Sequence, residues 1–295
     1  MSTGRSAWVA LFAAVVGLVG FAPAAEDAKP PAAPAAAPAE VESGFEVVRH
    51  ADIAYRTDPA ADKERHKLDV YVPKGCKDFP VVFFVHGGSW KSGNKNLYVA
   101  VGNTFAKLGL GVVITNYRLS PQVKHPAHVE DVARAFAWTC ANIGRYGGRP
   151  DRVFACGHSA GGHLVSLLAT DPTYLKAENR SPSDIAGVIA ISGVYRILHD
   201  FRLFHSVFGP DEEVCRRASP INHVSGKLPP FLIAYADSDY PQLDTMAEDM
   251  YAALKKGNHP ATLLKLKDRN HFTIILKVID PSDPLHRALL QFVGK

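Results

Sequence analysis

The chain has 295 residues, of which 47% are hydrophobic and 21% are charged. This composition is too apolar for a disordered chain, and the length suits one large α/β domain or two small ones. The net charge is +4, without a basic run or a basic stripe interleaved with aromatic residues, so we expect no nucleic-acid partner. The four cysteines form no Cys-x-x-Cys pair, and the chain contains no phosphate-binding loop. We therefore predict no metal and no cofactor.

The N-terminus has the pattern of a secretory signal peptide. Arg5 precedes an apolar run over residues 7–21, and the small residues Ala22 and Ala24 follow. The run of about 15 residues is shorter than the roughly 20 residues that a membrane-spanning helix needs. We therefore predict a signal peptide over residues 1–24 and a secreted or periplasmic protein without stable membrane insertion. An uncleaved N-terminal anchor is the alternative.

Residues 25–44 have the composition of a linker. Alanine and proline account for 12 of these 20 residues, so the segment cannot bury a core and should be an extended, semi-rigid spacer. The chain that follows, residues 45–295, has a length well suited to one α/β domain.

Within that domain, strand patterns alternate with helix patterns. Residues 80–85 (Pro-Val-Val-Phe-Phe-Val) are continuously apolar, as expected for a strand buried on both faces of a parallel sheet. We predict a helix at 126–143, and on it we expect Asp131, Arg134 and Asn142 to face outward. In chain order we expect strands at 45–55, 67–72 and 80–85, a helix at 97–108, a strand at 111–115, a helix at 126–143, a strand at 152–156, a helix at 160–169, a strand at 185–191, an irregular stretch at 194–227, a strand at 231–235, a helix at 243–256, a strand at 262–266 and a helix at 284–293. This alternation predicts a mostly parallel sheet covered by helices on both faces.

The strongest functional motif is residues 157–161, Gly-His-Ser-Ala-Gly, between an apolar strand and a helix. It matches the G-x-S-x-G nucleophile elbow, in which a serine occupies a strained turn and the flanking glycines let strand and helix approach. Ser159 is therefore the candidate nucleophile. The N-terminus of the following helix adds a field that favours a developing oxyanion.

A second motif, residues 86–90 (His-Gly-Gly-Ser-Trp), directly follows the buried strand at 80–85. Glycines at this point let the main chain direct its N–H groups toward a substrate carbonyl. A plain strand-to-helix turn would need the glycines but not the flanking histidine and tryptophan. Together with the elbow, the motif predicts an oxyanion hole.

A serine nucleophile needs a base, and we select His271 from the histidines of the chain. It follows the strand at 262–266 and so lies at the same sheet edge as Ser159, whereas His259 precedes that strand. His163 follows Ser159 by one helical turn and is expected to pack or face solvent. The remaining candidates, which fall in the irregular stretch and are expected at the surface, are His199, His205 and His223.

The acid that orients the base should follow the strand at 231–235. Asp237, Asp239 and Asp244 are the candidates. Asp244 lies inside the predicted helix and is better explained as a first-turn helix stabiliser. Chemistry alone does not separate Asp237 from Asp239.

Together these motifs resemble the α/β-hydrolase superfamily. The similarity is to serine carboxylesterases, including hormone-sensitive-lipase-like, feruloyl/acetyl-xylan esterase-like, isoprenylcysteine methylesterase-like and kynurenine formamidase-like members. The resemblance implies the α/β-hydrolase fold with a small lid segment at about 194–227. It also implies that Asp239 is the triad acid and that the N–H groups of Gly87, Gly88 and Ala160 form the oxyanion hole. The motifs that carry it are residues 68–73, 86–90, 116–121, 146–152, 157–162, 237–239 and 270–272.

The resemblance implies a serine ester hydrolase for short-acyl or modest-size esters, either small molecules or esters linked to a polysaccharide. One alternative is an aryl-formamidase that uses the same triad. A second is a catalytically dead binding protein on a hydrolase scaffold. The motifs do not define an oligomeric state.

We expect no disulfide bond. Export permits disulfides, but a domain of this size does not need one. The four cysteines concerned are Cys76, Cys140, Cys156 and Cys215.

Overall fold

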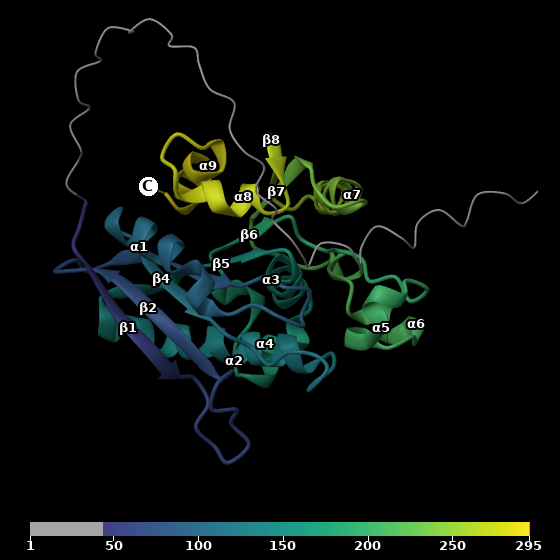
Figure 1. Cartoon of the computed structure of the whole chain (residues 1–295), viewed down its shortest axis with the longest axis horizontal. Helices are drawn as coiled ribbons and strands as arrows, with labels where there is room; N and C mark the ends of the chain where they lie inside the picture. The colour runs from purple at the N-terminus through teal and green to yellow at the C-terminus, as the bar shows by residue number, and fades with distance from the viewer. Residues whose placement is uncertain (1–43, 295) are drawn as a thin grey trace, which may run out of the picture. The chain divides into compact units, whose positions relative to one another are not determined.

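The computed structural model describes residues 44–294 (Figure 1). The predicted signal peptide and all but the last residue of the predicted linker lie outside the described residues. Between residues 44 and 294, no helix combines the length and the apolar character needed to cross a membrane.

The described residues form an eight-stranded sheet with the order β1-β2-β4-β3-β5-β6-β7-β8. The first two strands pair antiparallel with their neighbours, whereas β3 to β8 run parallel. This confirms the predicted mostly parallel sheet. The strands are β1 (Val47–Ala54), β2 (Lys67–Pro73), β3 (Phe79–Val85), β4 (Gly111–Thr115), β5 (Gly148–His158), β6 (Gly187–Ile191), β7 (Phe231–Ser238) and β8 (Ala261–Asn270).

Helices cover both faces of the sheet, and each face has its own apolar core. Along β3, alternate side chains enter different cores. Phe83 belongs to the core that includes the helices at 127–142, 160–170 and 243–256, and Phe84 belongs to the core that includes the helices at 99–107, 273–276 and 284–293. This double burial explains why β3 is continuously apolar in sequence. The α-helices are α1 (Val99–Lys107), α2 (Ala127–Asn142), α3 (Ala160–Thr170), α4 (Pro172–Ala177), α5 (Arg202–Phe208), α6 (Glu212–Arg217), α7 (Leu243–Lys256), α8 (Thr273–Leu276) and α9 (Pro284–Val293).

The topology brings four chain segments to one edge of the sheet. Because β3, β5, β7 and β8 are parallel, their carboxyl ends meet at that edge. His86 follows β3, Ser159 follows β5, Asp239 follows β7 and His271 follows β8. In open α/β sheets, ligands bind beyond these carboxyl ends.

The stretch at 194–227 contains two short helices, α5 and α6, where the sequence suggested irregular chain (Figure 1). Gly209 follows α5 and has a positive φ of 80°, which ends the helix after seven residues. Neither helix is long enough to show a clear 3.6-residue period, and this explains the missed prediction. Phe204 and Phe208 anchor the segment in the core, so it packs onto the domain.

The prediction for Asp131 is wrong, because this side chain is fully buried on α2 instead of facing outward. Its carboxylate accepts hydrogen bonds from Arg118 and lies 3.0 Å from His66 Nε2. A buried carboxylate is tolerated only when it is paired in this way. The pairing joins the chain before β2 to the start of α2.

All four cysteines lie in the described part of the chain and are free thiols. Cys140, Cys156 and Cys215 are buried, and Cys76 is half-buried. Burial raises the pKa of the Cys140 thiol to about 12, which keeps it protonated and unreactive at neutral pH.

Candidate active site

Ser159 lies at the turn between β5 and α3 with a φ of 56° and a ψ of −119°. A non-glycine residue in this region is strained. A Cβ atom on Gly157 would overlap the carbonyl oxygen of Gly161, and a Cβ on Gly161 would overlap the carbonyl of Val85. The turn therefore excludes any larger residue at both flanking positions, as the elbow pattern predicts.

The structure brings Ser159, His271 and Asp239 into one continuous set of hydrogen bonds. Ser159 Oγ lies 3.0 Å from His271 Nε2, and His271 Nδ1 lies 2.7 Å from Asp239 Oδ1. A carboxylate only accepts, so Nδ1 carries the proton and donates it toward Asp239. In the neutral imidazole, Nε2 then has a free lone pair that accepts from the Ser159 hydroxyl.

Asp239 is held in its charged form by its surroundings. Its second oxygen, Oδ2, accepts from Ser192 Oγ at 2.6 Å and from the N–H of Ala236 at 3.2 Å. Burial acts to raise the pKa of Asp239, but the hydrogen bonds from His271 and Ser192 outweigh it, so the pKa lies below its usual value. An ionised carboxylate therefore faces Nδ1 of His271 at neutral pH.

Asp237 occupies a different place from Asp239. Its exposed carboxylate accepts from the N–H groups of Asp268 (2.9 Å) and Arg269 (3.1 Å). These bonds tie the end of β7 to the end of β8. Asp244 lies in the first turn of α7 and accepts from the N–H of Thr245. Of the three candidate acids, only Asp239 contacts His271.

The loop after β3 lies against the elbow. A Cβ on Gly87 would come within 3.1 Å of Ser159 Cβ, so the two main chains are in close contact. Gly88 has a φ of 118°, which requires glycine. Among the described residues, the N–H groups of Gly88 and Ala160 have no hydrogen-bond acceptor, whereas the N–H of Gly87 lies 3.3 Å from the Tyr98 hydroxyl.

Trp90 connects this loop to the segment at 194–227. Its side chain is 4% exposed and its indole Nε1 donates to His163 Nδ1 at 3.2 Å. The indole ring also makes edge contacts with Phe204 and Phe208 of α5, with ring centroids 6.0 and 5.0 Å apart. Trp90 is therefore a packing residue between the loop at residues 86–90, the glycine loop, and α5.

The other candidate histidines do not contact Ser159 Oγ. His163 is buried and its Nε2 donates to the carbonyl of Ala218 at 2.8 Å. His205 and His223 bond main-chain carbonyls of their own segment, at His199 and Arg217. His259 precedes β8, away from the carboxyl end that carries His271.

Three residues around the base were not predicted from the sequence. Ser192 bonds Asp239, and the ring of Tyr240 stacks on His271 with centroids 4.3 Å apart. His158 donates to the main chain of His271 (2.9 Å). One signal was available: Ser192, His158 and Tyr240 all lie at or just beyond the carboxyl ends of parallel strands, where site residues are expected.

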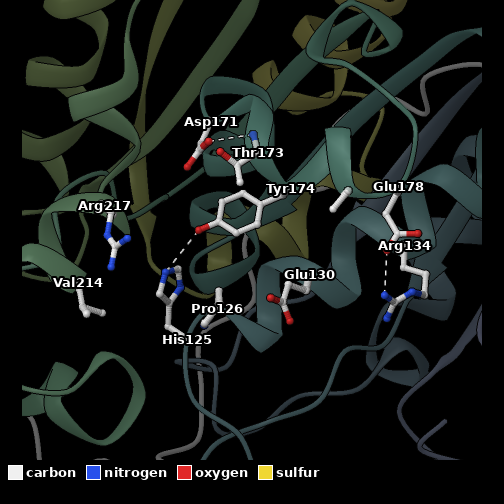
Figure 2. A pocket seen from close by; sticks show the side chains of 11 residues that line it. His125, Pro126, Glu130, Arg134, Asp171, Thr173, Tyr174, Glu178, Val214 and Arg217 are labelled. Carbon is white, nitrogen blue, oxygen red and sulfur yellow. Dashed lines mark hydrogen bonds and ion pairs between the residues drawn. The ribbon is translucent and has the colours of Figure 1, made fainter. Parts of the chain in front are cut away.

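A separate pocket of about 580 Å³ lies between α2, α4 and α6. Figure 2 shows Tyr174 pointing toward His125, and the Tyr174 hydroxyl lies 3.5 Å from Nε2 of that histidine. Arg134 and Glu178, which also line the pocket, form an ion pair at 2.9 Å. None of Ser159, Asp239 and His271 lines this pocket, so it is distinct from the serine site.

Comparison with solved structures defines the fold. A truncated carbohydrate esterase from gut microbiota superimposes with a TM-score of 0.73 at 21% identity, over 85% of this chain and 96% of that one. An esterase of Thermogutta terrifontis superimposes with a TM-score of 0.65 at 21% identity, over 86% and 93% of the two chains. The protein therefore has the α/β-hydrolase fold, as the motifs predict.

The BD-FAE family model matches residues 68–253, more than half of the chain. The chain belongs to the BD-FAE family. It is 28% identical to kynurenine formamidase of Danio rerio over 86% of this chain and 87% of that protein. It is 27% identical to a probable isoprenylcysteine alpha-carbonyl methylesterase of Arabidopsis thaliana, over 73% of this chain, and spans 50% of the length of that relative. These relatives confirm the resemblance found from the motifs.

Proposed function

We propose that this protein is a serine carboxylesterase that cleaves esters through a covalent acyl-enzyme on Ser159. One observation carries the proposal: the unbroken hydrogen-bonded set from Ser159 Oγ through His271 to Asp239, at 3.0 and 2.7 Å. This is the arrangement that activates a serine nucleophile. Membership of the BD-FAE family and similarity to named esterases support it.

In the proposed reaction, Ser159 Oγ attacks the ester carbonyl carbon while His271 Nε2 takes the hydroxyl proton. The resulting imidazolium gives that proton to the leaving alkoxide as the carbon–oxygen bond breaks. Water then attacks the acyl-enzyme, again with His271 as the base, and releases the acid. Asp239 holds the imidazole orientation and stabilises its positive charge in both halves.

The N–H groups of Gly88 and Ala160 are the two donors that are free to bind the proposed oxyanion, because neither donates a hydrogen bond to another group of the described chain. Ala160 is the first residue of α3, so the helix dipole adds to its effect. Gly87 is the third expected donor. Its N–H faces the Tyr98 hydroxyl at 3.3 Å and must exchange that contact for the substrate oxygen.

The proposed substrates are small-molecule or polysaccharide-linked esters outside the cytoplasm. The location rests on the signal-peptide pattern of residues 1–24. N-terminal sequencing of the exported protein checks it: a chain that begins at Ala25 supports export with cleavage, and a chain that retains Arg5 supports the anchor.

Activity should peak with acyl chains of two to four carbons. Phe204, Val207 and Phe208 are buried in the core, and both phenylalanines pack on Trp90, so they are not available to line a long acyl channel. An apolar pocket gains only about 1–3 kcal/mol per methylene that it accommodates. A series of p-nitrophenyl esters, which changes the acyl chain and keeps the leaving group, measures the profile. A profile that rises through decanoate would indicate a lipase-like channel and contradict this prediction.

An aryl-formamidase is the second candidate, and it uses the same three residues. The observation that favours it is the match to kynurenine formamidase, which covers 87% of that protein. Turnover of an aryl formamide is compared with turnover of p-nitrophenyl acetate on the same preparation. A kcat/KM for the ester that exceeds that for the formamide supports the esterase, and the reverse order supports the formamidase.

A further inference from the structure

His158, the residue directly before Ser159, lies between two loops: the loop after β8, which carries His271, and the loop after β3, which carries Gly87. Its side chain is 4% exposed, and its ring centroid lies 4.8 Å from that of His271. Nε2 of His158 lies 2.9 Å from the main-chain carbonyl oxygen of His271. On another side, a Cβ atom on Gly87 would lie 3.1 Å from Nδ1 of His158, so the imidazole also lies close to the glycine loop.

The hydrogen bond assigns the tautomer of His158. A carbonyl oxygen only accepts, so Nε2 of His158 must carry the proton, which leaves Nδ1 with a lone pair. That Nδ1 is buried and has no hydrogen-bond partner in the described chain. An unpaired buried polar atom lowers stability, so an apolar side chain would be the more stable choice if His158 only filled space.

We propose that His158 is a positioning residue for the reaction: by donating to the carbonyl of His271 it fixes the loop that carries the base against residues 86–90, the glycine loop that carries the expected oxyanion donors Gly87 and Gly88. This inference rests on the proposed function. The Asn270 side chain closes the turn between β8 and α8 by accepting from the N–H groups of Phe272 and Thr273, but this bonding lies within the loop itself. No other group of residues 44–294 donates to the His271 carbonyl. Positioning matters because a 1 Å displacement of a catalytic group can cost about 10²-fold in rate.

The charge state of His158 suits this role. Burial, followed by the proximity of His271, lowers the pKa of His158 to about 3, so it is neutral throughout the working range of an esterase. A second cation beside His271 would oppose the imidazolium that forms during the reaction. A neutral donor holds the loop without that penalty.

The test compares two substitutions of similar length and different chemistry. In His158→Gln the amide N–H₂ retains a donor that reaches the carbonyl, and in His158→Met no donor remains. We expect His158→Met to lower kcat for p-nitrophenyl acetate by about 10- to 100-fold with KM within about threefold, because the base is displaced while the acyl site is intact. We expect His158→Gln to keep kcat within about fivefold of the wild type.

His286→Met is the matched control. His286 is also buried, and its Nδ1 also bonds a main-chain carbonyl, that of Val278, at 2.8 Å. We expect its kcat to equal that of the wild type. If His158→Met fails to fold, His158→Asn replaces it, since its shorter amide does not reach the His271 carbonyl.

Three results would overturn the positioning role. These are a wild-type kcat in the variant without a donor, an equal loss in His158→Gln, or an equal loss in His286→Met. Ser159→Ala, measured in the same assay, separates this inference from the proposed function. If Ser159→Ala still turns over ester, the proposed function fails and the inference fails with it. If Ser159→Ala is inactive while His158→Met is unaffected, only the positioning role fails.

Discussion

Ser159→Ala is expected to abolish ester hydrolysis while the protein stays folded. The substitution removes the only oxygen within hydrogen-bonding distance of His271 Nε2 in the described chain, and loss of a triad nucleophile typically lowers kcat by about 10⁶-fold. Steady-state hydrolysis of p-nitrophenyl acetate measures the effect, and circular dichroism checks the fold.

Ser166→Ala provides the control for that substitution. Ser166 is a buried serine on the same helix, α3, and its hydroxyl donates to the carbonyl of Gly162 within the helix. We expect its kcat to stay close to the wild-type value. Residual activity of Ser159→Ala within tenfold of the wild type would contradict the assignment of the nucleophile.

Asp239→Asn is expected to lower kcat by about 10⁴-fold, since an amide at this position favours the wrong tautomer of His271. Asp239 Oδ1 is the group that accepts the proton of Nδ1, at 2.7 Å. A neutral amide also removes the negative charge that stabilises the imidazolium.

Asp237→Asn is the matched comparison, two residues away on the same strand end. Its carboxylate only accepts from the N–H groups of Asp268 and Arg269, and an amide oxygen retains part of that bonding. We expect kcat to stay within about tenfold of the wild type, far above that of Asp239→Asn. A larger loss in Asp237→Asn than in Asp239→Asn would show that the choice between the two carboxylates is wrong.

The sheet was predictable because its strands leave a simple pattern. The continuous apolar run of β3 follows from burial on both faces, and the glycines at 157 and 161 follow from the close approach of strand and helix at the elbow. Strand alternation with helices then gives the sheet edge at which Ser159 and His271 meet. These features depend on local sequence, and this is why they could be found without a structure.

Other features depend on contacts between distant segments. Asp131 was expected at the surface because a helical pattern does not reveal that Arg118 and His66 will pair with it. The choice between Asp237 and Asp239 needed the resemblance, since two carboxylates two residues apart look equivalent in sequence. The structure separates them, because only one faces His271 and the other caps the end of a neighbouring strand.

The contacts of the residues that support the base could not be predicted from the sequence, although the positions of these residues at the strand ends could. Ser192 follows β6, and Tyr240 follows Asp239 along the chain, but their contacts with Asp239 and His271 arise only when β6, β7 and β8 align. His158 was noted only as the variable position of the elbow motif. Its bond to the carbonyl of His271 joins residues 113 positions apart, a separation that no local pattern encodes.

Covalent labelling with a fluorophosphonate probe tests the central claim most directly. The probe reacts only with a serine that a neighbouring base activates, so it reports the chemistry of the set Ser159–His271–Asp239 without assuming a substrate. We predict one equivalent of probe per protein, located on Ser159 by peptide mass mapping, and no labelling of Ser159→Ala. Absence of labelling would contradict the account and favour a binding protein on a hydrolase scaffold. Equal labelling of wild type and Ser159→Ala would also contradict it, because the activated nucleophile would then be another residue.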